Sequence, residues 1–234
     1  VASQLLSFDT FTLHNIEFVF FEISATRLAL KNTFLLGVSA ATLGTILALV
    51  IAYVTTRKAV AGYRALEFLA TAPVAIPGIV LGVGLFLSYT RPPFILYGTL
   101  WILLIAFVTI SLPAAYQQLQ AAFRTVHPEL EDASRILGAT RLKALRQITA
   151  PLLRTGVIAT WCFIFVGVIR ELSAAVMLFT SETKVVSVLI FDLNESGDLG
   201  AIAVLGIMML AITFAVVILV NRVPGFGGGI RLRN

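Results

Sequence analysis

The chain has 234 residues, of which 59% are hydrophobic and only 12% are charged, and its mean hydropathy is +0.97. A soluble domain carries about 25% charged residues, so this chain has too few to cover a water-exposed surface and is expected to lie in a lipid bilayer. A net charge of +5 can indicate a nucleic-acid partner, but in membrane proteins Lys and Arg gather in cytoplasmic loops. We expect no nucleic-acid partner.

The first 31 residues contain "FTLHNIEFVFFEISATRLAL", an amphipathic stretch too polar to cross a bilayer. We expect residues 1–31 to form an extracytoplasmic lead-in, a helix or loop on the membrane surface. The chain begins with Val and shows no secretory signal pattern, so we expect it to be cut or processed from a longer one.

Five later segments have the roughly 20 mostly apolar residues that a membrane-spanning helix needs. They are Phe34–Val54, Leu66–Tyr89, Phe94–Tyr116, Leu152–Ile169 and Leu199–Val220. The second contains Pro73 and Pro77, which predict a kink. The apolar runs between 171 and 198 are too short to span, which favours a short or re-entrant helix. The membrane domain is predicted at 32–223, and a cytoplasmic tail at 224–234.

Five spans place the two termini on opposite sides of the membrane. If the segments after span one, around the loop between spans three and four, and after span five are cytoplasmic, twelve of the 17 Lys and Arg residues lie on that side. The other five lie on the opposite side. Because basic residues collect on the cytoplasmic side, this distribution predicts an extracytoplasmic N-terminus and a cytoplasmic C-terminus.

The longest cytoplasmic loop, residues 117–151, contains the acidic stretch "ELEDASRILGAT". Pro128 suits the first position of a helix, and Glu129, Glu131 and Asp132 in its first turn complement the helix dipole. Gly138 suits the left-handed conformation that ends a helix. The predicted face of small and apolar residues consists of Leu130, Ala133, Ser134 and Leu137.

A second helix, "RLKALRQITA", follows with Thr140 as its cap. Leu142, Leu145 and Ile148 form its predicted apolar stripe, typical of an interfacial helix. The first helix is acidic at its start, and anionic lipid would repel it. We therefore interpret Pro128–Leu137 as a docking element for another protein.

The run "EDASRILGATRLKALRQITAPLL" resembles the EAA loop of the membrane subunits of type I ABC importers. The family pattern is Glu-Ala-Ala, three residues, Gly, nine residues, Ile, any residue, Leu, Pro. The triplet here is Asp132-Ala133-Ser134, and the later positions are Gly138, Ile148 and Ala150-Pro151. The spacing is kept throughout, whereas Asp, Ser and Ala replace the usual Glu, Ala and Leu.

The stretches "ATAPVAIPGIVLGVGL", "YGTLWILLIAF" and "RELSAAVMLF" are similar to spans of ferric-iron permeases, especially the second half of the fused, two-half type. This resemblance implies an all-α, MetI-like transmembrane domain of a bacterial inner membrane, with about five spans and a cytoplasmic coupling helix in the loop 127–151. A fused parent would also account for the missing initiator Met.

The same resemblance implies a mechanism. The coupling helix would bind a cytoplasmic ATPase subunit, through the residues Glu131, Asp132, Ala133, Ser134, Leu137 and Gly138. The chain has no G-x-x-x-x-G-K-[ST] motif, so ATP and Mg would be bound by that subunit, and no cofactor is expected here. The other implied partners are a second permease half or copy and a periplasmic substrate-binding protein.

Candidate residues of the translocation path or gate are Pro77, Gly78, Arg170, Glu171 and Ser173. Arg170-Glu171 closes the fourth span, where a charged pair lies either at the interface or beside a watery path. Gly78 and Gly82 have the G-x-x-x-G spacing of packed membrane helices, for which intramolecular packing is the simpler interpretation.

Other polar side chains fit surface or structural roles. His14 and His127 are far apart in sequence and make no metal site, and Cys162 is interpreted as a small buried hydrophobe. The acidic residues Glu182, Asp192, Glu195 and Asp198 could face a binding protein or solvent.

We predict a transport subunit without catalytic residues, and ferric iron as its substrate. Importers of a phosphonate, a polyamine, thiamine or sulfate are alternatives of the same fold. A channel that works without an ATPase is the alternative from another class. A membrane enzyme is disfavoured because it should place nucleophiles, histidines or paired carboxylates within the spans, and we see no such group beyond Arg170-Glu171.

Overall fold

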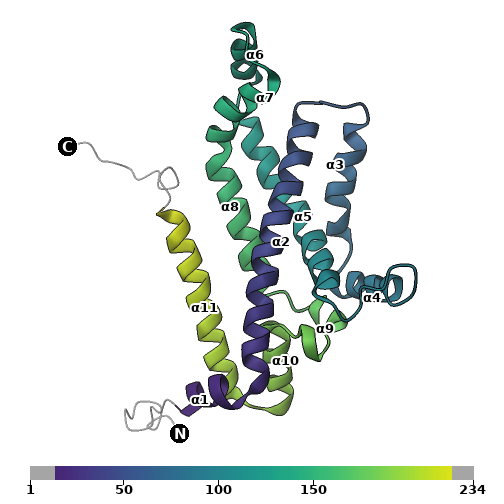
Figure 1. Ribbon diagram of the computed structural model, residues 1–234, viewed down its shortest axis with the longest axis vertical. Coiled ribbons are helices and arrows are strands. Elements are labelled where there is room, and N and C mark those ends of the chain that lie inside the picture. The colour runs from purple at the N-terminus through teal and green to yellow at the C-terminus, as the bar shows by residue number, and fades with distance from the viewer. Residues whose placement is uncertain (1–13, 223–234) are drawn as a thin grey trace, which may run out of the picture.

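Residues 14–222 are described by a computed structural model in which helices are the regular elements (Figure 1). The long helices are α2 (Ser24–Thr56), α5 (Leu100–Arg124), α8 (Ala150–Ile169) and α11 (Leu199–Asn221). Four helices are long and apolar enough to cross a membrane, and a bent pair makes a fifth candidate. This confirms the predicted all-α class with about five spans.

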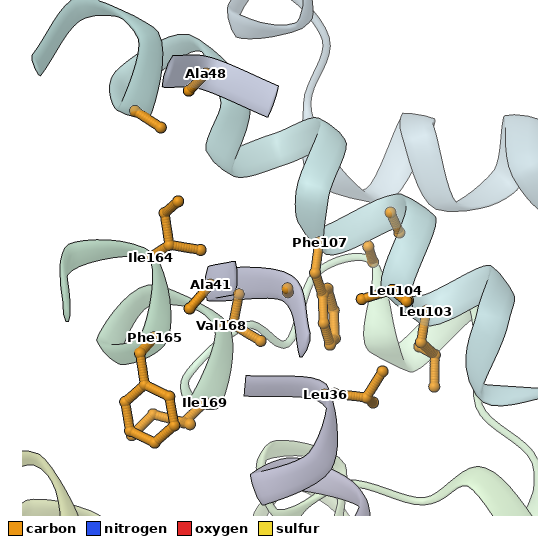
Figure 2. Packing of buried hydrophobic residues seen from close by; sticks show 14 of the residues in the cluster. Leu36, Ala41, Ala48, Leu103, Leu104, Phe107, Ile164, Phe165, Val168 and Ile169 are labelled. Atoms are coloured by element: carbon orange, nitrogen blue, oxygen red, sulfur yellow. The ribbon is translucent and has the colours of Figure 1, made fainter. Parts of the chain in front are cut away.

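Helix α2 is the central element and packs along both α5 and α8. Its buried face consists mainly of small residues, including Gly37, Ala41 and Ala48, and a Cβ on Gly37 would lie only 2.9 Å from the Phe165 ring. Figure 2 shows Leu36 and Ala41 of α2 among large side chains of α5 and α8. Small residues let helix backbones approach closely, which increases the van der Waals contact that holds membrane helices together.

Helix α2 begins at Ser24, within the residues 1–31 that were predicted as the lead-in. Before it lie α1 (His14–Glu17) and the π-helical turn η3 (Phe18–Glu22). Val19 of η3 and Ala29 of α2 are fully buried in a second apolar cluster with residues of α10 (Val186–Ser196) and α11. The amphipathic stretch therefore packs against other helices of the same chain. Residues 1–13 and the predicted tail 224–234 lie outside the described residues.

The third predicted span is displaced along the chain. Helix α5 begins at Leu100 instead of Phe94, since Pro92, Pro93 and Gly98 keep the preceding segment out of a helix. At its other end α5 continues through Arg124, into the predicted loop, because Leu119 and Phe123 extend its buried face.

The fourth span is continuous with the second loop helix. Helix α7 (Arg141–Ala144), the π-helical turn η5 (Leu145–Thr149) and α8 form one apolar helix from Arg141 to Ile169. Pro151 has no N–H for the carbonyl four residues earlier, and the wider π turn lies just before it. The second part of the loop, from Arg141, is thus continuous with the fourth span.

The second predicted span is broken, where we expected a kink. Helix α3 (Tyr63–Thr71) continues as the 3-10 turn η4 (Ala72–Ala75), and α4 (Gly78–Tyr89) then departs at 107° (Figure 1). Ile76 is extended, with φ −104° and ψ 117°, as expected for a residue before proline. Two prolines four residues apart therefore end one helix and begin another.

The segment 171–198 contains short helices, in agreement with the prediction. They are α9 (Ala175–Leu178), the 3-10 turn η6 (Ser181–Thr183) and α10. Helix α10 has 11 residues and is about 16 Å long, too short to cross the hydrocarbon core.

The predicted packing role of Gly82 is visible between α4 and α9. A Cβ at Gly82 would lie 3.0 Å from the Met177 Cβ and 3.3 Å from backbone atoms of Ala174. Gly84, on the same helix, has no neighbouring atom within 4 Å of the equivalent position. The two glycines therefore provide a matched comparison.

We predict that Gly82→Ala destabilises the protein by roughly 1–3 kcal/mol, because the added methyl group forces α4 and α9 apart. Gly84→Ala should leave stability unchanged or slightly raise it, since alanine favours a helix. Thermal unfolding of the purified protein in detergent measures both. Equal melting temperatures for the two variants would contradict the close α4–α9 contact.

Candidate functional site

Helix α6 (Pro128–Ile136) lies at one end of the molecule, beyond the ends of α5 and α8 (Figure 1). Its local features were predicted correctly. Pro128 occupies the first turn, and Gly138 has a left-handed φ of +90°. Thr140 caps the next helix by accepting the Lys143 backbone N–H at 3.3 Å. His127 occupies the N-cap position without a side-chain hydrogen bond.

The far end of α6 presents large apolar side chains to the outside. Ile136 is 85% exposed, Leu137 is 89% exposed, and Leu142 of α7 is 74% exposed. The predicted stripe of the second helix is thus only partly correct, because Leu145 and Ile148 are half-buried while Leu142 is not. The fully buried residues of the second helix are instead Ala144 and Thr149, which face the bundle.

The triplet that matches the EAA pattern lies on the surface. Asp132 and Ala133 are exposed, and Ser134 is half-buried. Asp132 forms a loose ion pair with Arg135, with 3.5 Å between the charged atoms and both side chains more than half exposed. These residues are free to contact a partner.

Glu131 has a different environment from the other predicted coupling residues. Its Oε1 accepts hydrogen bonds from Arg57 Nη2 at 2.9 Å, Arg57 Nε at 3.2 Å and Thr149 Oγ1 at 2.8 Å. Arg57 also donates to the Val126 carbonyl at 3.0 Å. The two charged side chains are only 9% and 12% exposed. Glu131 therefore joins α6 to the end of α2 and to η5, and it lies inside the protein.

Sequence reasoning did not find Arg57 or Thr149. They are 74 and 18 positions from Glu131 along the chain, so no local spacing relates the three. In the sequence, Arg57 is one of the twelve basic residues on the predicted cytoplasmic side. Its burial follows from the way α2 ends beside α6.

A second group of predicted residues meets where two helices are interrupted. A Cβ at Gly78 would lie 3.1 Å from the Ser173 Cβ and 3.6 Å from Glu171 Oε1. The break before α4, at Pro77-Gly78, therefore faces the break between α8 and α9. Glu171 Oε1 accepts the Ala174 backbone N–H at 3.2 Å, and its carbonyl accepts the Ser187 hydroxyl at 2.8 Å.

Arg170 is separated from this group although it precedes Glu171 in the chain. It ends α8 and lines an apolar cavity of about 510 Å³ between α8 and α11, together with Cys162 and Val217. Cys162 is buried, as predicted. Consecutive residues at a helix end point in different directions, which explains why a charged pair in the sequence is not a pair in space.

The remaining polar candidates have mainly structural surroundings. Asp192 forms an ion pair with Lys184 at 2.7 Å, and Asp198 caps α11 by accepting the Ala201 N–H at 3.0 Å. Glu182 and Glu195 are exposed. Within residues 14–222, no three His, Cys, Asp or Glu side chains are grouped so that they could hold a metal ion.

Relatives of the chain include permeases with different named substrates. It is 30% identical over 197 residues to the ferric transport system permease protein FbpB of Actinobacillus pleuropneumoniae, which covers 84% of this chain and 29% of that protein. The chain is 27% identical over 151 residues to a putative 2-aminoethylphosphonate transport system permease protein of Salmonella paratyphi A. That alignment covers 64% of this chain and 57% of the Salmonella protein. The chain thus spans less than two thirds of these relatives.

Solved structures with the same fold are ABC transporters. A bacterial alginate ABC transporter, in complex with an alginate pentasaccharide-bound periplasmic protein, has a TM-score of 0.73 at 18% identity, covering 94% of this chain and 83% of that one. The inward-facing methionine transporter MetNI has a TM-score of 0.69 at 15% identity, covering 91% and 97%. Residues 33–224 match the family described as binding-protein-dependent transport system inner membrane component, and the chain therefore belongs to that family.

Proposed function

We propose that the chain is the membrane-spanning permease subunit of an ATP-driven importer of ferric iron, with α6 as its coupling helix. The observation that carries this proposal is the exposed apolar end of α6, where Ile136 is 85% and Leu137 is 89% exposed. Exposed apolar groups outside the membrane mark a protein interface. A cytoplasmic ATPase subunit is the partner that we propose, because solved structures with the same fold are ABC transporters.

The arrangement of the helix ends supports the proposed orientation. The end of α2, the end of α5 and the start of α7 lie at the α6 end of the molecule (Figure 1). These segments carry Arg57, Lys58, Arg124, Arg141 and Lys143. A cytoplasmic position for this end follows the rule that Lys and Arg gather there, and it leaves the N-terminal end outside.

The complete importer would contain further subunits. Two ATPase subunits would bind ATP and Mg, a second permease half or copy would complete the path, and a periplasmic binding protein would deliver the substrate. In this arrangement ATP-driven movement of the coupling helices switches the path between inward-facing and outward-facing states.

The substrate path is proposed to pass the two facing helix breaks. Interrupted helices near the middle of a membrane leave polar groups free for substrate, and such breaks often mark binding sites in transporters. Here they bring the half-buried Glu171 and the exposed Ser173 beside Pro77-Gly78. A carboxylate and a hydroxyl are oxygen donors, which suit a hard cation.

Ferric iron is supported by the FbpB relatives, while a phosphonate is the second candidate, because the Salmonella relatives carry that name. Polyamine, thiamine and sulfate importers, and an ATPase-independent channel, have no such support among the relatives named above.

We predict that Leu137→Asp weakens retention of the ATPase subunit by about tenfold or more, since burying a leucine contributes about 1.5–3 kcal/mol and each 1.4 kcal/mol is a factor of ten. Val60→Asp is the control, because Val60 is an exposed apolar residue at the same end but outside α6. Co-purification in mild detergent is the measurement. An equal effect of both changes, or none, would refute α6 as the docking element.

Gly138→Val should separate ATP hydrolysis from transport. Its φ of +90° disfavours a β-branched residue by about 1–2 kcal/mol, while no atom lies within 4 Å to clash with the side chain. We expect ATP hydrolysis by the assembled importer to persist and its stimulation by the loaded binding protein to fall. Gly167→Val, also in open space but without a positive φ, is the control.

The substrate proposal predicts that Glu171→Gln lowers uptake of radiolabelled ferric iron severalfold in proteoliposomes holding the complete importer. Glutamine keeps an acceptor for the Ala174 N–H but removes the charge. Glu195→Gln, an exposed change on α10, should have no effect. Uptake of 2-aminoethylphosphonate in place of iron would favour the second candidate and contradict the first.

A further inference from the structure

Helix α2 makes specific buried polar contacts near both of its ends. At its C-terminal end the contacts are those of Arg57 with Glu131, which also binds Thr149; we call them the α6 linkage. At its N-terminal end, Asn32 and Thr33 contact residues 182–186; we call these the α10 linkage. The 33 residues of α2 correspond to a length of about 50 Å.

The α10 linkage is as well formed as the α6 linkage. Asn32 Nδ2 donates to the carbonyls of Glu182 and Lys184, at 3.0 Å each, and Thr33 Oγ1 accepts the Val186 N–H at 2.8 Å. Asn32 is only 4% exposed. Because its amide satisfies two carbonyls near the start of α10, displacement of α2 without α10 would leave buried polar groups unpaired.

The α10 linkage continues to the proposed substrate path. Ser187, in the first turn of α10, donates its hydroxyl to the Glu171 carbonyl at 2.8 Å and is 8% exposed. Glu171 lies beside Gly78 and Ser173 at the two helix breaks. Buried hydrogen bonds and one unbroken helix thus connect α6 to the path.

We propose that α2 transmits movement of α6 to the path, with Arg57 and Asn32 as positioning residues at its two ends. The proposal rests on the proposed function, since it presumes that a partner ATPase moves α6. Between its ends α2 packs on α5 and α8 mainly through small side chains, with Thr42 accepting the Trp161 indole N–H at 3.1 Å, whereas the two linkages fix α2 to α6 and to α10. Glu131 serves this connection from inside, and Asp132 and Leu137 remain available to the ATPase.

A competing route exists through α8, which is continuous with α7 and ends at Ile169, two residues before Glu171. The two routes differ at Asn32. Loss of the Asn32 amide interrupts the α2 route and leaves α8 intact, so the path should respond to ATP only if α8 carries the movement.

The experiment uses the assembled importer in proteoliposomes, with Cys162→Ala and a reporter cysteine, Ser173→Cys, at the exposed path position. The rate at which a maleimide labels this cysteine is measured with and without ATP and vanadate. In this parent we expect ATP to change the rate by about fivefold or more, the lower range of allosteric coupling.

In Asn32→Ala, Thr33→Val and Arg57→Lys we expect ATP to change the labelling rate by less than about twofold, while the ATPase still binds and hydrolyses ATP. Thr33→Val preserves the shape of the side chain and Arg57→Lys preserves its charge. These two variants therefore still test transmission through α2 if Asn32→Ala prevents folding. The controls are Asn194→Ala, at an exposed position of α10, and Glu129→Gln, at an exposed position of α6. Both should show the same ATP response as the parent.

A parent-like ATP response in Asn32→Ala and Thr33→Val would overturn the proposal and assign transmission to α8. Failure of the ATPase to bind the intact chain is a different result, since it would refute the coupling function itself and the transmission with it. Loss of the response together with normal ATP hydrolysis supports α2, because destabilisation alone would also release the ATPase.

Discussion

The close packing of α2 against α5 and α8 is the constraint on which the rest of the structure depends. In a bilayer, apolar side chains gain little by leaving lipid for protein, so helices associate through van der Waals contact and a few hydrogen bonds. Gly37 and Gly44 leave room for Phe165 and Ile164, and a Cβ at either glycine would approach these side chains to 2.9 Å and 3.2 Å. With α2 held in this way, its two ends define the positions of α6 and of α10.

Interruptions of the helices complement this packing. Pro77, between η4 and α4, and the segment Arg170–Ser173, between α8 and α9, each mark an interruption of a helix inside the apolar part of the chain. Unpaired backbone groups are tolerated at membrane depth only where protein or water satisfies them. Glu171 and Ser187 provide that satisfaction at one break, which keeps both helix ends in a defined place while leaving Ser173 exposed.

The two faces of α6 divide the proposed function between them. Outward, Asp132, Ala133 and Leu137 are exposed, as a docking element requires. Inward, Glu131 holds the helix to the bundle through a buried ion pair. Breaking such a pair leaves an uncompensated buried charge, so α6 is attached firmly to α2. A docking helix without that attachment could move on its own and transmit nothing.

The sequence by itself determined the features set by local chemistry and composition. Apolar segments long enough to span gave the all-α membrane class, and the pattern around Pro128, Gly138 and Thr140 gave the start of α6, its end and the next cap. Only the tertiary structure decided that Glu131 faces inward. It also decided that Arg170 and Glu171 have different surroundings and that Gly78 lies against Ser173. These depend on contacts between segments far apart in the chain, whereas helix signals such as N1 proline and left-handed glycine act over a few residues.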